Sequence, residues 1–244
     1  MKKKIIIYSI IAITIVVLVT YGILKNEITS SNMSNQKNSN EIPEVKDEKI
    51  FLNVSSELDY SVDLSDPKVM EEISEYIAIV KIDSIDGVSN INNITNEYVS
   101  PYSYGKASII YLLKGNLKSD KFNFIRLGGT MPFNEWIKGD EDPKKILELK
   151  SDSNLKNVPN KDILVKYQVV DDIDLEIGKT YLAYLTSDEY IKKGDFYITG
   201  LQYGLREIEH NEKSLNSNNL KKVKVKNNTT NKWENITDVV STLK

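Results

Sequence analysis

The sequence GKASIIYLLK, at residues 105–114, decides the fold class of this chain. In an extended backbone, one side of this stretch would carry Ala107, Ile109, Tyr111 and Leu113. Successive side chains of a strand point to opposite faces, so this period of two is typical of a β-strand with one strongly buried face. The stretch therefore predicts a strand in a mainly β core.

Similar patterns lie on both sides of this strand. Gly115 and Asn116 supply a turn into KFNFIRL at residues 121–127, and Gly128-Gly129 ends that second strand. Further strands are predicted at residues 77–82, 162–170 and 180–186, and as an interrupted pair at residues 196–208. Several short strands bounded by glycine turns, with little helix between them, indicate a mostly antiparallel barrel or sandwich.

A short helix is predicted before the first of these strands. Asp66 can cap it, and Pro67 suits the first helical position, where a missing N–H costs nothing. Apolar residues then recur at three- and four-residue spacing, at Val69, Met70, Ile73 and Ile77. Residues 90–103 are expected to form a polar loop, and residues 130–160 to be the least regular part of the domain.

Three phrases of the chain, taken together, resemble a known family. They are YIAIVKI at residues 76–82, a stretch ending in YLLKG at Gly115, and IGKTYLAYL at residues 177–185. Their order is similar to that of the netrin-module and tissue-inhibitor-of-metalloprotease type of OB-fold barrel, and to that of membrane-anchored bacterial proteins with such phrases. The resemblance covers about residues 66–207. It implies an OB-like, partly closed antiparallel barrel with a short N-terminal helix and small helical additions.

The resemblance implies no functional residue. The eukaryotic inhibitors of that family use an N-terminal edge held by cysteine, and this chain contains no cysteine. It also has an apolar segment in the place where that edge would be. The family resemblance therefore bears on fold alone.

An uncharged apolar run begins at Ile5 and ends at Leu24. At about 1.5 Å of rise per residue, a helix of this length spans about 30 Å, the hydrocarbon thickness of a bilayer. Lysines at positions 2, 3 and 4 predict that the N-terminus stays in the cytoplasm and that the rest lies outside. The alternative is a cleaved signal peptide. A signal peptide has a shorter apolar core than this run, and the residues that follow the run match a signal-peptide cleavage site poorly.

These patterns divide the chain into five parts. They are a basic cytoplasmic end (residues 1–4), a transmembrane anchor (5–24), a flexible tether (25–49), an extracytoplasmic β-barrel domain (50–210) and a polar, basic extension (211–244). The tether is expected to be flexible because its polar composition leaves too little apolar surface to offset the entropy of ordering. The net charge of −3 gives no field that would attract nucleic acid, so no nucleic-acid partner is expected.

The residues that carry most enzyme chemistry are scarce. The sequence has no cysteine and one histidine, His210, which we expect at the surface near the end of the last strand. A nucleophilic triad or a zinc site would lack its usual parts. We therefore expect no catalytic, cofactor-binding or metal-binding residue.

Carboxylates offer another route to catalysis. The densest acidic run carries Asp171, Asp172, Asp174 and Glu176, and the next is Asp140-Glu141-Asp142. Neither run follows the spacing of a calcium-binding loop, and we interpret both as solvated loops. Two carboxylates of the first run facing each other across a pocket, about 5–10 Å apart, would instead favour a hydrolase.

Two stretches are candidates for partner contacts. Phe133 and Trp136 lie in the irregular region, where exposed aromatic residues often anchor interfaces but apolar side chains also pin long loops to a core. The alternating lysines of residues 221–226 could meet anionic lipid or wall polymer, or could guard an edge strand against pairing. Both alternatives stay open for each stretch.

Taken together, the sequence predicts a non-catalytic binding module outside the cell membrane, held in the lipid bilayer by the segment from Ile5 to Leu24. An envelope protein or an anionic wall polymer is the expected kind of partner. The alternative function is a cell-envelope hydrolase that uses carboxylates only, and no cofactor is expected.

Overall fold

The computed structural model describes residues 50–139, 143–152, 155–209, 215 and 219–243. The predicted anchor and tether, residues 5–49, lie outside the described residues. Across the ranges that are described, no helix combines the length and the apolar character needed to cross a membrane.

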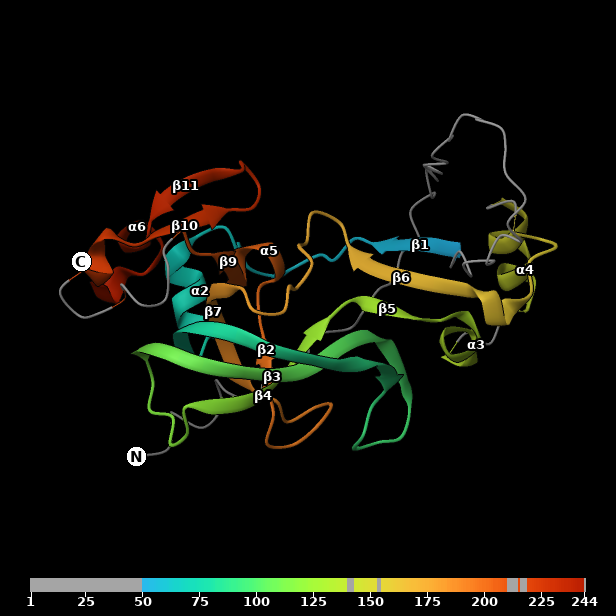
Figure 1. The fold of residues 1–244 in the computed structure, drawn as a ribbon, viewed down its shortest axis with the longest axis horizontal. Helices are drawn as coiled ribbons and strands as arrows, with labels where there is room; N and C mark the ends of the chain where they lie inside the picture. The colour runs from blue at the N-terminus through green and yellow to red at the C-terminus, as the bar shows by residue number, and fades with distance from the viewer. Residues whose placement is uncertain (1–49, 140–142, 153–154, 210–214, 216–218, 244) are drawn as a thin grey trace, which may run out of the picture.

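A circuit of paired strands forms the centre of the molecule (Figure 1). Its members are β2 (Tyr76–Ile91), β3 (Tyr98–Lys114), β4 (Lys121–Leu127), β8 (Phe196–Ile198) and β7 (Thr180–Ser187). Each pairs with the next in this order, and β7 pairs back onto β2. The β4–β8 pairing is parallel and the others are antiparallel. The prediction of a mainly β fold with a partly closed sheet is confirmed.

Apolar side chains fill the inside of this circuit, because alternate residues of its strands point inward. They include Val80, Ala107, Phe124, Ala183 and Ile198, all of them buried. The two alanines leave room for Phe124, the largest of these side chains. Small and large side chains together fill the interior of the barrel.

The strand at residues 105–114 does not keep one buried face along its whole length. Ala107 and Ile109 pack inside the barrel, whereas Tyr111 and Leu113 pack against the cluster on the opposite face. The cause is a register shift, because β2 residues 79 and 80 pair with β3 residues 111 and 109. An extra residue in one strand moves the side chains that follow it to the other face. The prediction that all four alternate residues share a face is therefore wrong.

The strands β2 and β3 continue beyond the barrel as a long hairpin. The sequence predicts a polar loop at residues 90–103, but only residues 92–97 lie outside the two strands. Backbone pairing with β3 extends as far as Ile91, opposite Tyr98, and the polar side chains of this part are compatible with a strand exposed to water. A Cβ at Gly105 would lie 2.1 Å from the Ser84 carbonyl oxygen, so the close approach of β2 requires glycine there.

A second sheet of three strands lies beside the barrel (Figure 1). It contains β1 (Ile50–Ser56), β6 (Ile163–Val169) and β5 (Gly129–Pro132), with β6 in the middle. β1 runs parallel to β6 over seven residue pairs, and β5 runs antiparallel to β6. The strand predicted at residues 162–170 is therefore present, but it belongs to this sheet and not to the barrel.

The region expected to be irregular contains short helices next to this sheet. They are α3 (Phe133–Trp136), η1 (Ile137–Gly139), α4 (Pro143–Asp152) and η2 (Asn160–Asp162). Figure 1 shows α3 and α4 at the end of the sheet that is farther from the barrel.

The outer face of β2 and β7 is covered by α2 (Pro67–Ile73) and by the C-terminal segment. The Asp66 carboxylate accepts a hydrogen bond from the Lys68 amide at 2.9 Å, which confirms the predicted helix start. The C-terminal segment contains η4 (Leu220–Lys222), β10 (Lys224–Asn227), β11 (Lys232–Asn235), α6 (Ile236–Val239) and η5 (Ser241–Leu243). Its buried Val225 and Ile236 share one apolar cluster with Ile79 of β2.

Two remaining short elements lie beside β7. They are α5 (Leu201–Gly204) and β9 (Leu205–Glu207), and β9 pairs with the part of β7 around Leu182. These elements occupy the stretch where the sequence predicts a strand pair interrupted by glycine.

Candidate functional site

A cavity of about 240 Å³ opens beside β3 and β4, between the tip of the long hairpin and the β7–β8 loop. Its lining residues are Ser89, Asn93, Tyr102, Tyr104, Ile125 and Lys192. Ile125 directly follows Phe124, which points into the barrel, so Ile125 points outward into this cavity. The lining therefore combines aromatic walls with a hydroxyl, an amide and an ammonium group.

The aromatic wall of the cavity is held in place. Tyr102 is 1% exposed, and its hydroxyl donates a hydrogen bond to the carbonyl oxygen of Ile91 at 2.6 Å. The ring of Tyr104 lies next to it, with ring centroids 6.4 Å apart. A buried tyrosine whose hydroxyl has a partner loses little further freedom when a ligand packs against it.

The hairpin tip, residues 92–97, is ordered by its own hydrogen bonds. The side-chain oxygen of Asn92 accepts hydrogen bonds from the amides of Ile94 at 2.8 Å and Thr95 at 3.1 Å. The Asn92 amide also donates to the carbonyl oxygen of Glu97 at 2.8 Å. These contacts form an Asx-type turn, which fixes a short polar loop without a hydrophobic core.

The β7–β8 loop, residues 188–195, is ordered in a similar way. The buried Asp188 carboxylate accepts hydrogen bonds from the amides of Tyr190 at 2.9 Å, Ile191 at 3.0 Å and Lys192 at 2.6 Å. The Asn93 amide of the hairpin tip then donates to the Ile191 carbonyl oxygen at 3.0 Å. The two loops are thus fixed individually and joined to each other above the cavity.

Large apolar side chains are exposed on the same two loops. Tyr190 is 63% exposed and Ile94 is 52% exposed. Single exposed apolar residues are ordinary, but apolar residues exposed on loops that flank a cavity suit an interaction surface. We call these two residues the apolar rim.

No single sequence pattern predicts this site. Its lining residues come from four separate parts of the chain, and the nearest sequence signal is the run of tyrosines at Tyr98, Tyr102 and Tyr104. In the sequence, these tyrosines lie within or just beyond residues expected to form a polar loop, where they would look like isolated surface residues. Pairing of β3 with both β2 and β4 places Tyr102 and Tyr104 at the cavity, which Lys192 of the β7–β8 loop also lines.

A buried ion pair lies on another side of the barrel. Arg126 of β4 donates to the Asp172 carboxylate at 2.5 Å, and the side chains of both are almost fully buried. A second guanidinium nitrogen donates to the carbonyl oxygen of Ile173 at 2.6 Å. Burial raises the pKa of Asp172, although the guanidinium beside it acts in the opposite direction. This pair fixes the β6–β7 loop to the barrel.

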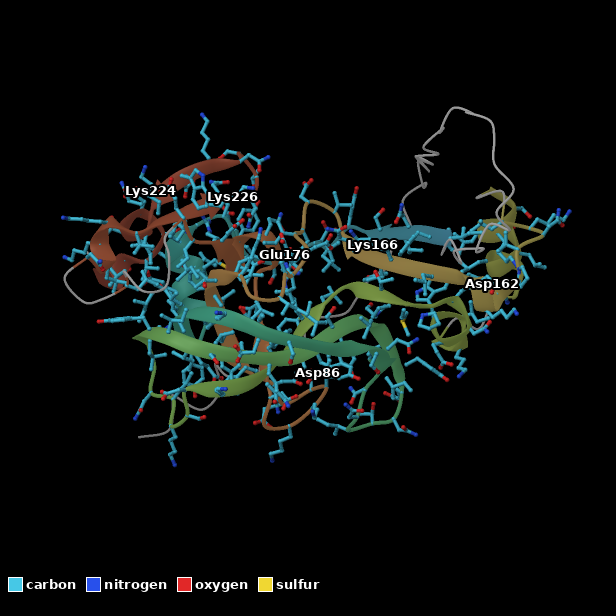
Figure 2. All side chains as sticks on the ribbon, in the orientation of Figure 1. Asp86, Asp162, Lys166, Glu176, Lys224 and Lys226 are labelled. Carbon is cyan, nitrogen blue, oxygen red and sulfur yellow. The ribbon has the colours of Figure 1, made fainter. Side chains whose placement is uncertain are left out.

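Three carboxylates of the acidic run are paired with separate basic side chains, and Asp171 is exposed. Asp172 binds Arg126, whereas Asp174 lies 2.7 Å from the ammonium of Lys166 and Glu176 lies 2.7 Å from that of Lys179. Figure 2 labels Lys166 on β6 and Glu176 in the loop that follows β6. Each of these three carboxylates thus has its own cation, and none of them lines the cavity described above.

The structure gives the two candidate aromatic residues different environments. Phe133 is fully buried and packs with Ile163 and Val165 in the core of the three-stranded sheet. Trp136 is partly buried against the same cluster, with its ring centroid 5.9 Å from that of Phe133. Both lie in α3 and not in an irregular loop. Phe133 therefore pins this region to the core, while a partner contact by Trp136 stays a prediction.

The lysine-rich stretch is not an unpaired edge strand. β10 pairs with β11 on one side, and on the other side Val225 forms a bridge with Ile208. The amide of Glu209 also donates to the carbonyl oxygen of Lys224 at 3.0 Å. Protection of a free edge therefore does not explain the lysines of β10.

A second cavity, of about 280 Å³, lies between α2 and the C-terminus. The ammonium of Lys114 donates to the carbonyl oxygens of Glu71 and Ser74 at the end of α2. The Glu71 carboxylate in turn accepts hydrogen bonds from the amide and the hydroxyl of Ser241. These groups hold α2, β3 and the C-terminus together, which is a structural role.

Two of the residue groups considered in the sequence, His210 and residues 140–142, lie outside the described residues. In the part of the chain that the structure covers, no group of three or more His, Asp or Glu side chains is arranged to hold a metal ion. No protein-family model, no curated protein and no solved structure matches this chain.

Proposed function

We propose that this chain is a membrane-anchored, extracytoplasmic binding module that recognises a polypeptide partner at the cavity and its apolar rim. The observation that carries this proposal is the hydrogen bond between Asn93 and Ile191, which joins two ordered loops around an aromatic cavity. A surface that is already ordered loses less conformational entropy on binding. A larger share of the free energy of its contacts therefore remains as binding free energy.

The position of the cavity supports an OB-like barrel. Along the chain, the five strands of the circuit are β2, β3, β4, β7 and β8. The cavity uses the second and third of them, together with the loops between the first and second and between the fourth and fifth. OB-folds bind ligands at this same combination of strands and loops.

The chemistry of the cavity favours an apolar side chain of a partner over an anionic polymer. The ammonium of Lys192 lies 3.1 Å from the Asp195 carboxylate, so its charge is balanced within the loop. The rim adds exposed Tyr190 and Ile94. Aromatic and aliphatic residues around a small pocket are typical of protein interfaces with a central anchor residue.

The arrangement of the acidic run supports a non-catalytic role. A hydrolase that uses carboxylates alone needs two of them on opposite sides of a substrate. Here Asp172, Asp174 and Glu176 are each engaged by a different basic side chain. The cavity is instead lined by groups suited to contact and hydrogen bonding.

The membrane anchor and the location outside the cytoplasm rest on the apolar run from Ile5 to Leu24 and on the lysines before it. We expect protease added to cells without a wall barrier to digest the domain while a cytoplasmic control protein stays intact. Protection of the domain until the cells are lysed would contradict this topology.

We expect Asn93→Trp to weaken partner binding at least tenfold, because the indole would fill the cavity while the backbone hydrogen bond to Ile191 is kept. A photoreactive phenylalanine analogue at Tyr190 should crosslink one defined polypeptide in intact cells, and crosslinking should fall in the Asn93→Trp background. Asn116→Trp, in the exposed β3–β4 turn, is the matched control.

The same photoreactive residue placed at Ile177 is the control that tests whether crosslinking depends on its position. Ile177 is 61% exposed and belongs to the β6–β7 connection. Equal crosslinking from Ile177 and Tyr190, or no effect of Asn93→Trp on a folded variant, would contradict the proposed site. Circular dichroism of the purified full chain establishes that each variant is folded.

A further inference from the structure

The C-terminal hairpin has an outer face that is both basic and aromatic. Val225 of β10 is fully buried, so its neighbours Lys224 and Lys226 point away from the core. The register places Lys226 directly opposite Trp233 of β11, and Trp233 is 40% exposed. Figure 2 labels both lysines on this hairpin, at the end of the molecule. We call Lys224, Lys226 and Trp233 the basic hairpin face.

The inner side of the hairpin is firmly attached to the rest of the domain. Glu234 lies 3.0 Å from the guanidinium of the buried Arg206. The side-chain amide of Asn228 donates to the carbonyl oxygens of Gln202 at 2.7 Å and Leu205 at 2.8 Å. The basic hairpin face is therefore presented on a rigid support, and its exposure does not come from a loose end.

The hairpin region has an excess of positive charge. Residues 220–235 contain five lysines and a single acidic residue, Glu234, which is engaged by Arg206. Glu209, whose carboxylate lies 3.9 Å from the ammonium of Lys224, offsets one further charge. The chain as a whole has a net charge of −3, so this excess is local. It is complementary to an anionic surface.

We propose that the basic hairpin face docks on the anionic surface of the bilayer that carries the anchor, so that the domain lies against the membrane. This inference rests on the proposed anchor. Lysine ammonium groups are attracted to anionic headgroups, and tryptophan prefers the interface between headgroups and hydrocarbon. A tether of 25 residues reaches on the order of 25–30 Å, which keeps the domain within range of the surface.

A bilayer fits this face better than a wall polymer does. The face is a two-stranded ribbon whose lysines and tryptophan project from the same side, and it contains no cavity among those described. A single polymer chain is usually held in a groove that follows its backbone, whereas an exposed ribbon can approach a planar surface with all its side chains at once.

The full chain, reconstituted into vesicles that contain an acyl-brominated lipid, provides the test. Bromine quenches tryptophan that enters the interface, and Trp233→Phe gives the background from Trp136, the second tryptophan. We expect the Trp233 emission to be quenched in vesicles containing phosphatidylglycerol and not in vesicles of phosphatidylcholine alone. High salt should reverse the quenching because it screens the headgroup charge.

Lys224→Gln combined with Lys226→Gln should weaken docking about 25-fold, at about fivefold for each lysine. Lys118→Gln with Lys121→Gln, two exposed lysines near the β3–β4 turn, should have no effect. Equal Trp233 quenching in both vesicle types, or quenching that survives the first double substitution, would overturn the proposal. The proposal would also be overturned if a soluble phosphodiester polymer, added together with the anionic vesicles, prevented the quenching of Trp233 by the brominated lipid.

Failure of docking can be distinguished from failure of the anchor. Flotation of the vesicles at alkaline pH reports whether the chain is inserted, independently of the state of Trp233. A chain that floats with the vesicles but shows no quenching keeps its anchor and refutes docking, whereas a chain that does not float refutes the anchor itself.

Discussion

Asp172→Ala is expected to lower the free energy of unfolding by about 3–5 kcal/mol, because it leaves the buried guanidinium of Arg126 without its counter-ion. An arginine side chain does not lose its proton in proteins, so deprotonation cannot relieve the penalty. The Arg126 side chain is almost fully buried, and water therefore screens the unpaired charge poorly. Denaturant unfolding of the full chain measures the change.

The matched control for this prediction is Asp174→Ala. Asp174 belongs to the same loop and pairs with Lys166, but its side chain is 63% exposed. A surface ion pair of this kind contributes at most about 1 kcal/mol. An effect of Asp172→Ala no larger than that of Asp174→Ala would show that the buried pair is not isolated from solvent.

A double substitution separates the ion pair from its packing. Arg126→Met with Asp172→Leu removes both charges and should cost less than Asp172→Ala alone, because no unpaired charge stays buried. A double variant that is less stable than Asp172→Ala would mean that the two side chains stabilise the loop mainly through shape and not through charge.

Phe133→Ala is expected to cost about 3–5 kcal/mol of stability, because it removes a fully buried ring and leaves a cavity in the core of the three-stranded sheet. Thermal unfolding followed by circular dichroism measures this change. A domain of this size loses about 2–4 °C for each kcal/mol, so the effect should be readily detected.

Trp136→Ala is the informative comparison. Trp136 is only partly buried, so we expect a smaller loss of several degrees, in keeping with a ring that packs on Phe133. An unchanged melting temperature for Trp136→Ala would favour a role of this ring in contacting a partner. An unchanged melting temperature for Phe133→Ala would contradict the packing described for the sheet.

The parts of the fold that follow from local sequence could be predicted. Asp66 and Pro67 mark the start of α2, and the period of two at residues 121–127 marks β4. The predicted strands do not include β1, although Leu52 and Val54 alternate with exposed residues in the way that a half-buried strand requires.

Barrel closure and the division into two sheets could not be predicted from local patterns. The strand β6 has an alternating pattern similar to that of the barrel strands, yet it pairs with β1, more than a hundred residues earlier in the chain. Period and composition describe which face of a strand is buried, but they do not identify the strand that pairs with it.

The same limit applies to the sites. Asp172 looks like one more residue of a solvated acidic loop, and only the distant Arg126 explains why it is buried. The cavity requires residues as far apart as Ser89 and Lys192, brought together by pairing of β2 with both β3 and β7. In contrast, the excess of lysine in the C-terminal hairpin was visible directly, because charge is a local property of the sequence.

The attachment of β1 has a mechanical consequence. β1 is the first described element after the proposed tether, and it belongs to the small sheet, where β6 is its one partner among the described strands. Tension transmitted from the membrane would therefore act first on the seven residue pairs between these two strands. Because β1 is paired on one side, this pairing would be expected to separate before the barrel strands that carry the proposed binding loops.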